Sequence, residues 1–359
     1  MNVGFLIYDD LSTISGGYLY DRKIVEYLKS CEDKVSVISI PRKNYALNLI
    51  DNCSYTLLKK LYNLDIDILI EDELNHPSLF RINYLLTRKI NYPIISIIHH
   101  LRSQERCTKL LEKLYRHIEF RYLNSVNGFI YNSNTSKYTV EKLIGSIRPS
   151  VVAYPGRDQF EVNITEDDIV NRVRTTEILK ILFLGNVIPR KGLHILLSAL
   201  DRLKIDNWIL NVIGRLDSEK LYTKKVKRLI RKKRIENNVY FLGLLSDKEL
   251  IQYFKRSDIL VVPSFYEGFG IVYLEGMGFG IPVIATTNGG AKEIIGNGKE
   301  GFLVEPHDFV SISDYIEMLF RDKDLLLDMS INALKRYRSF HKWESSTSKI
   351  RGFLKSFIE

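Results

Sequence analysis

The chain has 359 residues, 45% of them apolar and 26% charged, with a formal net charge of +9. These values exclude a disordered chain and provide enough residues for two domains of about 100–200 residues each. No apolar run approaches the roughly 18 residues of a membrane-spanning helix, and the N-terminal sequence MNVGFLIYDD lacks the basic leader of a signal peptide. Cys31, Cys53 and Cys107 are far apart, without metal-binding spacing, so we expect a cytoplasmic protein with reduced thiols.

Short apolar runs alternate with helical patterns through the first half of the chain, as in a doubly wound α/β domain with a parallel sheet. The expected strands are residues 3–8, 35–40, 65–70, 93–99, 128–131 and 151–154. Pro155 and Gly156 follow the last of these strands and precede the polar residues 157–177. We therefore place a domain boundary between residues 157 and 158.

Two strand ends in this half could contact a ligand. Gly16 and Gly17 open a helix after the first strand, and a glycine pair at a helix N-terminus can hold a phosphate. His99 ends the strand at 93–99, and the carboxyl ends of parallel strands line the crevice in which α/β sheets bind ligands. The register of this strand favours His99 over His100. A plain βα turn and a structural histidine are the alternatives.

The second half repeats the alternation, with expected strands at residues 178–184, 208–214, 239–243, 259–263 and 281–285. Gly185 follows the first of these strands, and Lys191 precedes a helix that opens at Gly192, which is again the arrangement of a phosphate site. Gly214 and Gly243 end the next two strands, at the edge where α/β sheets bind ligands.

The segment from Pro263 to Glu293 combines a strand end, a glycine loop, a helix and another strand. Gly268 and Gly270 let a ligand approach the backbone, and the unpaired N–H groups at the following helix start favour a phosphate. Glu267 and Glu275 bracket this helix start. Because carboxylates repel phosphate, we expect them to bind hydroxyl groups of a sugar and a ribose. An ordinary βα turn with solvated glutamates is the alternative.

Three strings in this segment, EGFGIVYLE, GIPVIA and Gly289–Gly290, resemble the signature of the retaining glycosyltransferases of family 4, which have the GT-B fold. The resemblance implies an α/β protein with two doubly wound, Rossmann-like domains that face each other across a cleft. Residues 1–157 would form the acceptor-side domain, and residues 158–342 the nucleotide-sugar-binding domain. The C-terminal helix, residues 343–359, would pack back on the first domain.

The resemblance also implies a reaction. The enzyme would be a retaining hexosyltransferase that moves a sugar from a UDP- or GDP-linked donor to a glycan or lipid-linked acceptor, without a metal or other cofactor. Cations and helix dipoles would neutralise the charge on the leaving diphosphate. The catalytic residues would be His99, Glu267, Lys191 and Arg190. The donor-binding residues would be Gly16, Gly17, Gly185, Asn186, Gly214, Gly243, Gly268, Phe269, Gly270, Ile271 and Glu275.

The resemblance assigns separate roles to these side chains. Glu267 would hold hydroxyl groups of the donor sugar, Glu275 would hold the ribose, and His99 would contact the sugar from the first domain. The arginine that usually follows the first glycine is Asn186 in this chain, so Arg190 would supply the missing cation. No second carboxylate stands out as a nucleophile, which favours front-face attack with the leaving phosphate as the base.

Asp65 and Asp67 form an Asp-x-Asp pattern, which binds metal in glycosyltransferases of another fold. The two aspartates alternate with isoleucines at a strand start, and no partner carboxylates accompany them. We therefore do not expect a metal site.

The positive charge is concentrated in residues 219–234, which contain nine lysines and arginines. This run is either a solvated helix face or a docking site for an anionic membrane. The basic amphipathic segment 41–63 is either a packed helix or a surface that faces a membrane or a lipid-linked acceptor. The inner face of a membrane is therefore a second candidate location, beside the cytoplasm. No nucleic-acid-binding module accompanies these residues, so nucleic acid is not an expected partner.

Two other functions fit the same fold. A sugar-nucleotide epimerase would convert the donor sugar without an acceptor. A non-catalytic nucleotide-sugar-binding protein would keep the fold without turnover, and Asn186 is the feature that favours it.

Overall fold

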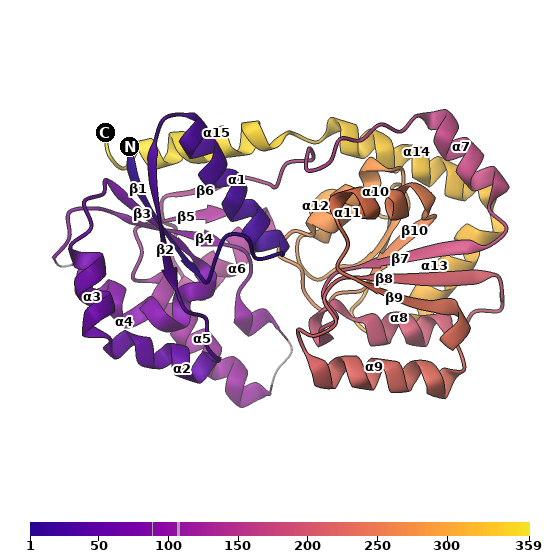
Figure 1. Cartoon of the computed structure of the whole chain (residues 1–359), viewed down its shortest axis with the longest axis horizontal. Coiled ribbons are helices and arrows are strands. Elements are labelled where there is room, and N and C mark those ends of the chain that lie inside the picture. Colours follow the sequence, from indigo (N-terminus) through magenta and orange to yellow (C-terminus); the bar gives the residue numbers. More distant parts are fainter. Residues whose placement is uncertain (88, 106–107) are drawn as a thin grey trace. The chain divides into compact units, whose positions relative to one another are not determined.

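The structure, a computed structural model, describes residues 1–87, 89–105 and 108–359. Cys107 lies outside these residues. The chain divides into two compact units, one formed by Met1–Gly156 with Lys342–Glu359 and the other by Arg157–His341. Each unit is built around its own parallel sheet, with helices on both faces (Figure 1). The boundaries fall one residue before those expected from the sequence.

The sheet of the first unit has six parallel strands in the order β2-β1-β3-β4-β5-β6. Its strands are β1 (Asn2–Tyr8), β2 (Lys34–Ile40), β3 (Ile68–Asp72), β4 (Ile94–Ile98), β5 (Gly128–Tyr131) and β6 (Ser150–Val152). Every residue of β3 and β4 is buried, as expected for a parallel sheet covered on both faces. Since the strand order reverses at β1 and β3, the carboxyl ends of these strands border the position where doubly wound sheets bind ligands.

Helices α1 and α15 pack against each other in this unit, as do α4 and α5 (Figure 1). The helices are α1 (Gly16–Ser30), α2 (Tyr45–Ile50), α3 (Tyr55–Tyr62), α4 (His76–Leu86), α5 (Lys109–Leu123), α6 (Asn134–Ile144) and α15 (Trp343–Lys355). The sequence predicts one basic amphipathic helix over residues 102–123, but this segment begins as a 3-10 turn, Arg102–Gln104. Thr108 then caps α5 by accepting a hydrogen bond from the Leu111 N–H group.

The C-terminal helix α15 belongs to the first unit. Its Arg351 Nε lies 2.7 Å from Asp33 Oδ2, and the Trp343 ring meets the Tyr20 ring edge-on at 5.7 Å. Gly156 allows the chain to approach the start of α15, because a Cβ atom there would lie 2.1 Å from the Trp343 nitrogen. An ion pair, an aromatic contact and a close backbone approach therefore fix this helix to the unit.

The sheet of the second unit also has six parallel strands, in the order β12-β11-β10-β7-β8-β9. Its strands are β7 (Leu179–Leu184), β8 (Trp208–Ile213), β9 (Val239–Gly243), β10 (Ile259–Val262), β11 (Val283–Thr286) and β12 (Gly301–Val304). The order reverses at β7 and β10, so the loops that follow these two strands flank the ligand-binding position of this sheet.

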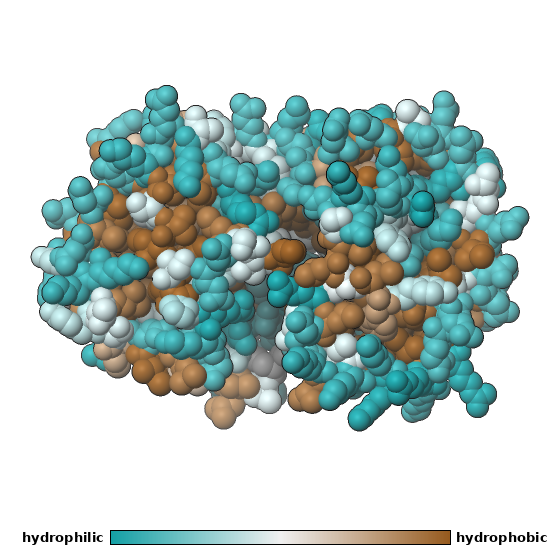
Figure 2. Space-filling view, in the orientation of Figure 1, coloured by the Kyte–Doolittle hydropathy of each residue, from teal (hydrophilic) through white to brown (hydrophobic). Residues whose placement is uncertain are grey.

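The helices of the second unit are α7 (Glu166–Thr175), α8 (Leu193–Leu200), α9 (Lys220–Lys233), α10 (Asp247–Arg256), α11 (Ile271–Gly278), α12 (Ala291–Ile294), α13 (Phe309–Arg321) and α14 (Lys323–Ser339). All lysines and arginines of α9 except Lys233 are exposed, and Figure 2 shows mostly hydrophilic residues where Figure 1 places this helix. In the part of the chain that the structure describes, no helix is both long enough and apolar enough to cross a bilayer.

Candidate functional site

Three glycines bring the loops after β7, β8 and β9 into direct contact. Gly185 and Gly214 have φ angles of +148° and +141°, which residues other than glycine rarely adopt. A Cβ atom on Gly214 would lie 2.2 Å from the Gly185 carbonyl oxygen. The Gly214 N–H group donates to the Gly243 carbonyl oxygen at 2.9 Å. The carboxyl edge of the sheet therefore presents a surface made largely of backbone.

Glu267 binds both predicted cations on this edge. Lys191 Nζ lies 2.5 Å from Glu267 Oε1 and 3.1 Å from Oε2, and Arg190 Nη1 lies 2.8 Å from Oε1. The three side chains are largely buried, with exposures of 9–19%. Burial lowers the pKa of Lys191, and the Glu267 carboxylate opposes this effect. The structure therefore unites three predicted catalytic residues that come from two distant segments.

Backbone contacts hold these two segments together. Arg190 Nη1 also donates to the Tyr266 carbonyl oxygen at 2.8 Å, and the Phe265 N–H group donates to the Arg190 carbonyl oxygen at 2.7 Å. Gly192 ends the loop with a φ angle of +72°, and a Cβ atom there would lie 2.1 Å from the Pro263 carbonyl oxygen. The position of the cations is thus set by backbone packing and not by side-chain rotamers alone.

Gly289 and Gly290, which follow Glu267 in the chain, contact its backbone. The Gly290 N–H group donates to the Glu267 carbonyl oxygen at 2.8 Å. A Cβ atom on Gly289 would lie 2.0 Å from the same oxygen. The glycine pair in the signature therefore packs closely against the Glu267 backbone and fixes its position.

The helix α11 starts where the sequence predicts a phosphate site. Gly270 precedes it with a φ angle of +98°, and Ile271 is its first residue. The amide groups of a helix start carry partial positive charge. The Phe269 side chain is buried, with its ring 6.0 Å from the Phe340 ring, so the main chain of Phe269 is the part suited to contact a ligand.

Glu275 has a different environment from Glu267. It is half-buried on α11, and among the described residues its carboxylate makes no hydrogen bond or ion pair. Burial, followed by the nearby Asp247 charge, raises its pKa to about 7. A half-buried acceptor without a partner among the described residues is suited to bind ligand hydroxyl groups.

Asn186, which stands where the family usually has an arginine, connects two loops in this structure. Its Oδ1 accepts a hydrogen bond from the Arg215 N–H group at 3.2 Å, which connects the loops after β7 and β8. The two cations beside Glu267 are Arg190 and Lys191.

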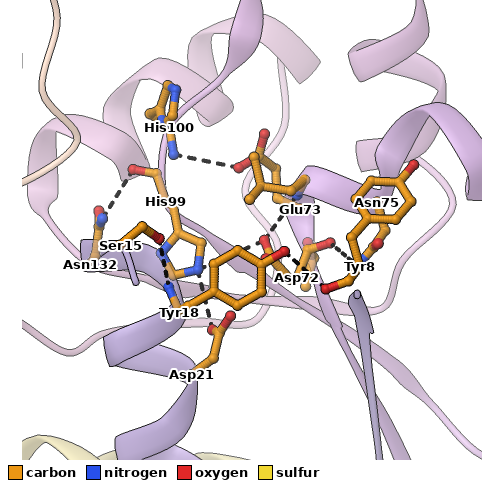
Figure 3. Close-up of polar contacts among 12 residues, drawn as sticks. Tyr8, Ser15, Tyr18, Asp21, Asp72, Glu73, Asn75, His99, His100 and Asn132 are labelled. Carbon is orange, nitrogen blue, oxygen red and sulfur yellow. Dashed lines mark hydrogen bonds and ion pairs between the residues drawn. The ribbon is translucent and has the colours of Figure 1, made fainter. Parts of the chain in front are cut away.

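His99 lies directly after β4 and is the centre of a buried polar cluster in the first unit (Figure 3). Its Nε2 is 3.2 Å from Asp21 Oδ1 and 3.7 Å from Asp72 Oδ1. Gly17 permits this packing, because a Cβ atom there would lie 3.3 Å from the His99 ring. Gly16 is the first residue of α1.

The two aspartates set the charge of His99. Burial alone would disfavour the imidazolium ion, but Asp21 and Asp72 outweigh it and raise the pKa of His99 to about 9. Burial, with the charge of Asp21, raises the pKa of Asp72 to about 7. Burial, with the charge of Asp72, also raises the pKa of Glu73. At neutral pH we therefore expect a protonated His99 among these acids.

His100 has different partners. Its Nε2 lies 2.9 Å from Glu105 Oε1. Its backbone N–H group donates to Glu73 Oε2 at 3.5 Å (Figure 3). His99 is therefore the histidine whose ring lies beside Asp21 and Asp72.

Asp21 and Asp72 were not predicted as site residues. The available signal is their position: Asp72 ends the apolar run of β3, and Asp21 lies within the buried face of α1. A charged residue in such a place requires a partner, but the sequence does not indicate which one.

The ligand atoms of Asp21, Asp72 and His99 lie within 4.8 Å of one another, so these residues form a group that could hold a metal ion. At neutral pH the proton on a cationic His99 would occupy the nitrogen that a metal needs. Asp67 lies at the other end of β3, where its Oδ2 accepts the Asn2 N–H group at 2.7 Å. Asp67 therefore has a structural hydrogen bond, at the strand end away from His99.

Residues 165–336 match the model of a known family, described as glycosyl transferases group 1. This part of the chain belongs to that family. The signature strings and the Lys191 and Glu267 loops lie within the matched residues. The family resemblance seen in the sequence is thereby confirmed.

Curated relatives match this chain over part of their length. An uncharacterized glycosyltransferase of Methanocaldococcus jannaschii is 32% identical over 170 residues, which are 47% of this chain and 46% of that protein. A capsular polysaccharide biosynthesis glycosyltransferase of Staphylococcus aureus is 31% identical over 179 residues, 48% of this chain and 46% of that protein. The chain thus spans about half the length of these relatives.

Solved structures match the whole chain. The sucrose-phosphate synthase of Thermosynechococcus elongatus has a TM-score of 0.84 at 17% identity, with 99% of this chain and 98% of that chain covered. Anabaena HepE, solved with UDP-glucose, has a TM-score of 0.76 at 21% identity, with coverage of 99% and 100%. At such identities the match shows the fold alone. The prediction of the GT-B fold, with two doubly wound units, is confirmed.

Proposed function

We propose that this protein is a retaining hexosyltransferase that transfers a sugar from a UDP- or GDP-linked donor to a glycan or lipid-linked acceptor, without a bound metal. The observation that carries the proposal is the contact of Arg190 and Lys191 with Glu267, beside the glycine loops and the start of α11. A nucleoside diphosphate needs such a combination of cations, helix amides and close backbone approach.

Arg190, Lys191 and Glu267 suit the charges that develop on the donor during sugar transfer. Cleavage of the bond between the sugar and the diphosphate builds positive charge on the sugar and negative charge on the leaving phosphate. Lys191 and Arg190 would stabilise the negative charge, because preorganised cations in a largely buried site act strongly. Glu267 would hold the two cations in place and accept hydrogen bonds from hydroxyl groups of the donor sugar.

Glu275 and His99 complete the proposed set. Glu275 would accept hydrogen bonds from the ribose, since it has no partner among the described residues. The protonated His99 would donate a hydrogen bond to the donor sugar, with Asp21 and Asp72 holding its ring. Gly16 and Gly17 would provide backbone contacts beside it. Among the described residues we assign no carboxylate as a nucleophile. We therefore favour attack on the face that the phosphate leaves, with the phosphate as the base.

The comparisons support a nucleotide-sugar donor. HepE was solved with UDP-glucose, and a relative from Mycobacterium tuberculosis, 26% identical over 197 residues, is a GDP-mannose-dependent phosphatidylinositol monomannoside mannosyltransferase. We therefore propose a UDP- or GDP-sugar, used in polysaccharide or glycolipid synthesis.

We also propose that the protein works in the cytoplasm, at the inner face of an anionic membrane. The net charge of +9 and the exposed cations of α9 support this location. Lys233, the partly buried lysine of α9, is not among these exposed cations, and its Nζ lies 2.6 Å from Asp201 Oδ2.

A direct test is hydrolysis and transfer with UDP-, GDP- and ADP-sugars in the presence of EDTA. We expect turnover with at least one donor, and loss of turnover in Lys191→Ala. The matched control is Lys335→Ala, an exposed lysine on α14. Binding of a donor without any turnover would instead favour the non-catalytic binding protein, for which Asn186 is the supporting observation.

A further inference from the structure

The first two turns of α5 are exposed on all sides. Each residue from Thr108 to Leu114 is exposed, including Leu110 at 79%, Leu111 at 41% and Leu114 at 42%. An amphipathic helix of a globular domain normally turns its leucines toward the core. In α5 the buried residues begin only with Ile118. These three leucines therefore do not contribute to the core of the unit.

Helix α2 extends this apolar surface. Leu47 and Ile50 are 46% and 62% exposed. The Tyr45 ring of α2 meets the Tyr115 ring of α5 at 4.6 Å, and the Arg102 guanidinium lies 5.2 Å and 5.1 Å from the two rings. The two helices are thus joined, and we call their exposed apolar residues the α2–α5 surface: Leu47, Ile50, Leu110, Leu111 and Leu114. Figure 2 shows hydrophobic atoms along the lower edge of this unit, where Figure 1 places α2 and α5.

Cations are interspersed with these leucines. Lys109, Lys113 and Arg116 are exposed on the same turns of α5, and Glu112 is the acidic residue among them. Within the described ranges, these three cations form no ion pair. Exposed leucines next to lysines and arginines are typical of helices that lie in the interface of an anionic bilayer.

We propose that the α2–α5 surface docks on an anionic lipid bilayer, with its leucines at the boundary between headgroups and acyl chains. A second copy of the chain is a poorer partner, because the same cations would face each other across a symmetric contact. A neutral glycan would not need this combination of aliphatic and cationic side chains.

The docking proposal rests on, and extends, the proposed function. The start of α5 follows His99 after ten residues, and in a parallel sheet a helix begins near the edge at which the preceding strand ends. A bilayer at the start of α5 would therefore lie near the strand edge that carries His99. This location suits an acceptor whose lipid part remains in the membrane.

Vesicle flotation tests the proposal. We expect the full chain to float with vesicles of phosphatidylcholine and phosphatidylglycerol, and not with phosphatidylcholine alone. Leu110→Ser with Leu114→Ser should weaken binding at least about tenfold. The control is Ile147→Ser, since Ile147 is an apolar residue outside α2, α5 and α9 that is 85% exposed. It should bind as the wild type does.

Three results would overturn the proposal. They are no flotation of the wild type with the anionic vesicles, wild-type binding by the double variant, or an equal loss with Ile147→Ser, which would show that the loss is not specific to the α2–α5 surface. Circular dichroism checks the fold of each variant, and exposed substitutions should leave it unchanged. Hydrolysis of a water-soluble donor should be equal in the wild type and the double variant. If hydrolysis is absent while flotation behaves as expected, the proposed function fails and the docking surface stands.

Discussion

Lys191 Nζ and Glu267 Oε1 lie 2.5 Å apart, although 76 residues separate them in the chain. Both side chains are largely buried, and Arg190 shares the same oxygen. This contact joins the loop after β7 to the loop after β10, on the two strands at which the sheet order reverses. The carboxylate therefore has a structural role, because without it two cations would face each other in a buried position.

Glu267→Gln should lower both stability and turnover. Removal of one partner from a buried ion pair leaves charge without compensation, which costs about 3 kcal/mol. Glu275→Gln is the matched control, since Glu275 has no such partner among the described residues and its pKa is already raised to about 7. We expect this second variant to lose donor binding while it keeps its free energy of unfolding. Urea denaturation measures the difference, and equal destabilisation of both variants would contradict this assignment.

Gly214→Ala should weaken binding of a nucleoside diphosphate at least about tenfold and lower stability by about 1–3 kcal/mol. A Cβ atom at this position would lie 2.2 Å from the Gly185 carbonyl oxygen and would push the two loops apart. Gly352→Ala is the control, because a Cβ atom there has no neighbour within 4 Å. Calorimetric titration with UDP and GDP measures the affinity. Unchanged affinity in Gly214→Ala would show that these loops do not hold the ligand.

The contribution of His99 to stability should depend on pH. Its pKa in the folded protein is raised from 6.5 to about 9, so the protonated form stabilises the fold. The full contribution, on the order of 2–3 kcal/mol, is present below about pH 6.5 and is lost as the pH rises through about 9. The acids that face the ring are Asp21 from α1, Asp72 from β3 and Glu73 after it.

Urea denaturation of the wild type and His99→Gln at a series of pH values measures this contribution. The stability difference between the two proteins should shrink as the pH rises from 6.5 to 9. His117→Gln, at an exposed position on α5, serves as the control. A difference that stays constant over this range would mean that His99 is not held as a cation.

Asp21→Asn should lower the pKa of His99 toward its ordinary value, because the charge of Asp21 is the strongest influence that raises it. The turnover rate should fall, and its dependence on pH should move to more acidic values. Proton NMR of the His99 ring measures the titration directly. Loss of turnover without any movement of this titration would assign a purely structural role to Asp21.

EDTA should leave turnover unchanged if cations and helix amides stabilise the leaving diphosphate. The measurement is the initial rate of donor hydrolysis with EDTA and after addition of Mg²⁺. Loss of activity that Mg²⁺ restores would require a metal, and Asp21, Asp72 and His99 would be the first candidates to hold it.

The sequence predicts the folds of both units and most of the second-unit site because these features are local. Alternation of apolar runs with helical patterns defines the strands, and the glycines mark the loops at their ends. The string around Glu267 also has a family signature, which identifies Glu267 and Glu275 without a structure. The fold of each sheet then places the predicted residues at its carboxyl edge.

Contacts between residues that are distant in the chain could not be predicted in this way. The sequence does not reveal that Asp21 and Asp72 meet His99, because their contacts depend on the packing of α1 against the sheet. Asn186 looks like a lost cation in the sequence, yet in the structure it binds the Arg215 N–H group. The start of α5 was also predicted too early, since hydrophobic periodicity does not distinguish the 3-10 turn at Arg102–Gln104 from the helix that follows.

The central claim is that Lys191 binds the diphosphate of the donor without a metal. Calorimetric titration of UDP and GDP, in EDTA, into the wild type, Lys191→Ala and Lys335→Ala tests it most directly. We predict that at least one nucleotide binds the wild type and Lys335→Ala equally and binds Lys191→Ala at least about tenfold more weakly. Equal binding by all three proteins, or binding that appears only with added Mg²⁺, would contradict the claim.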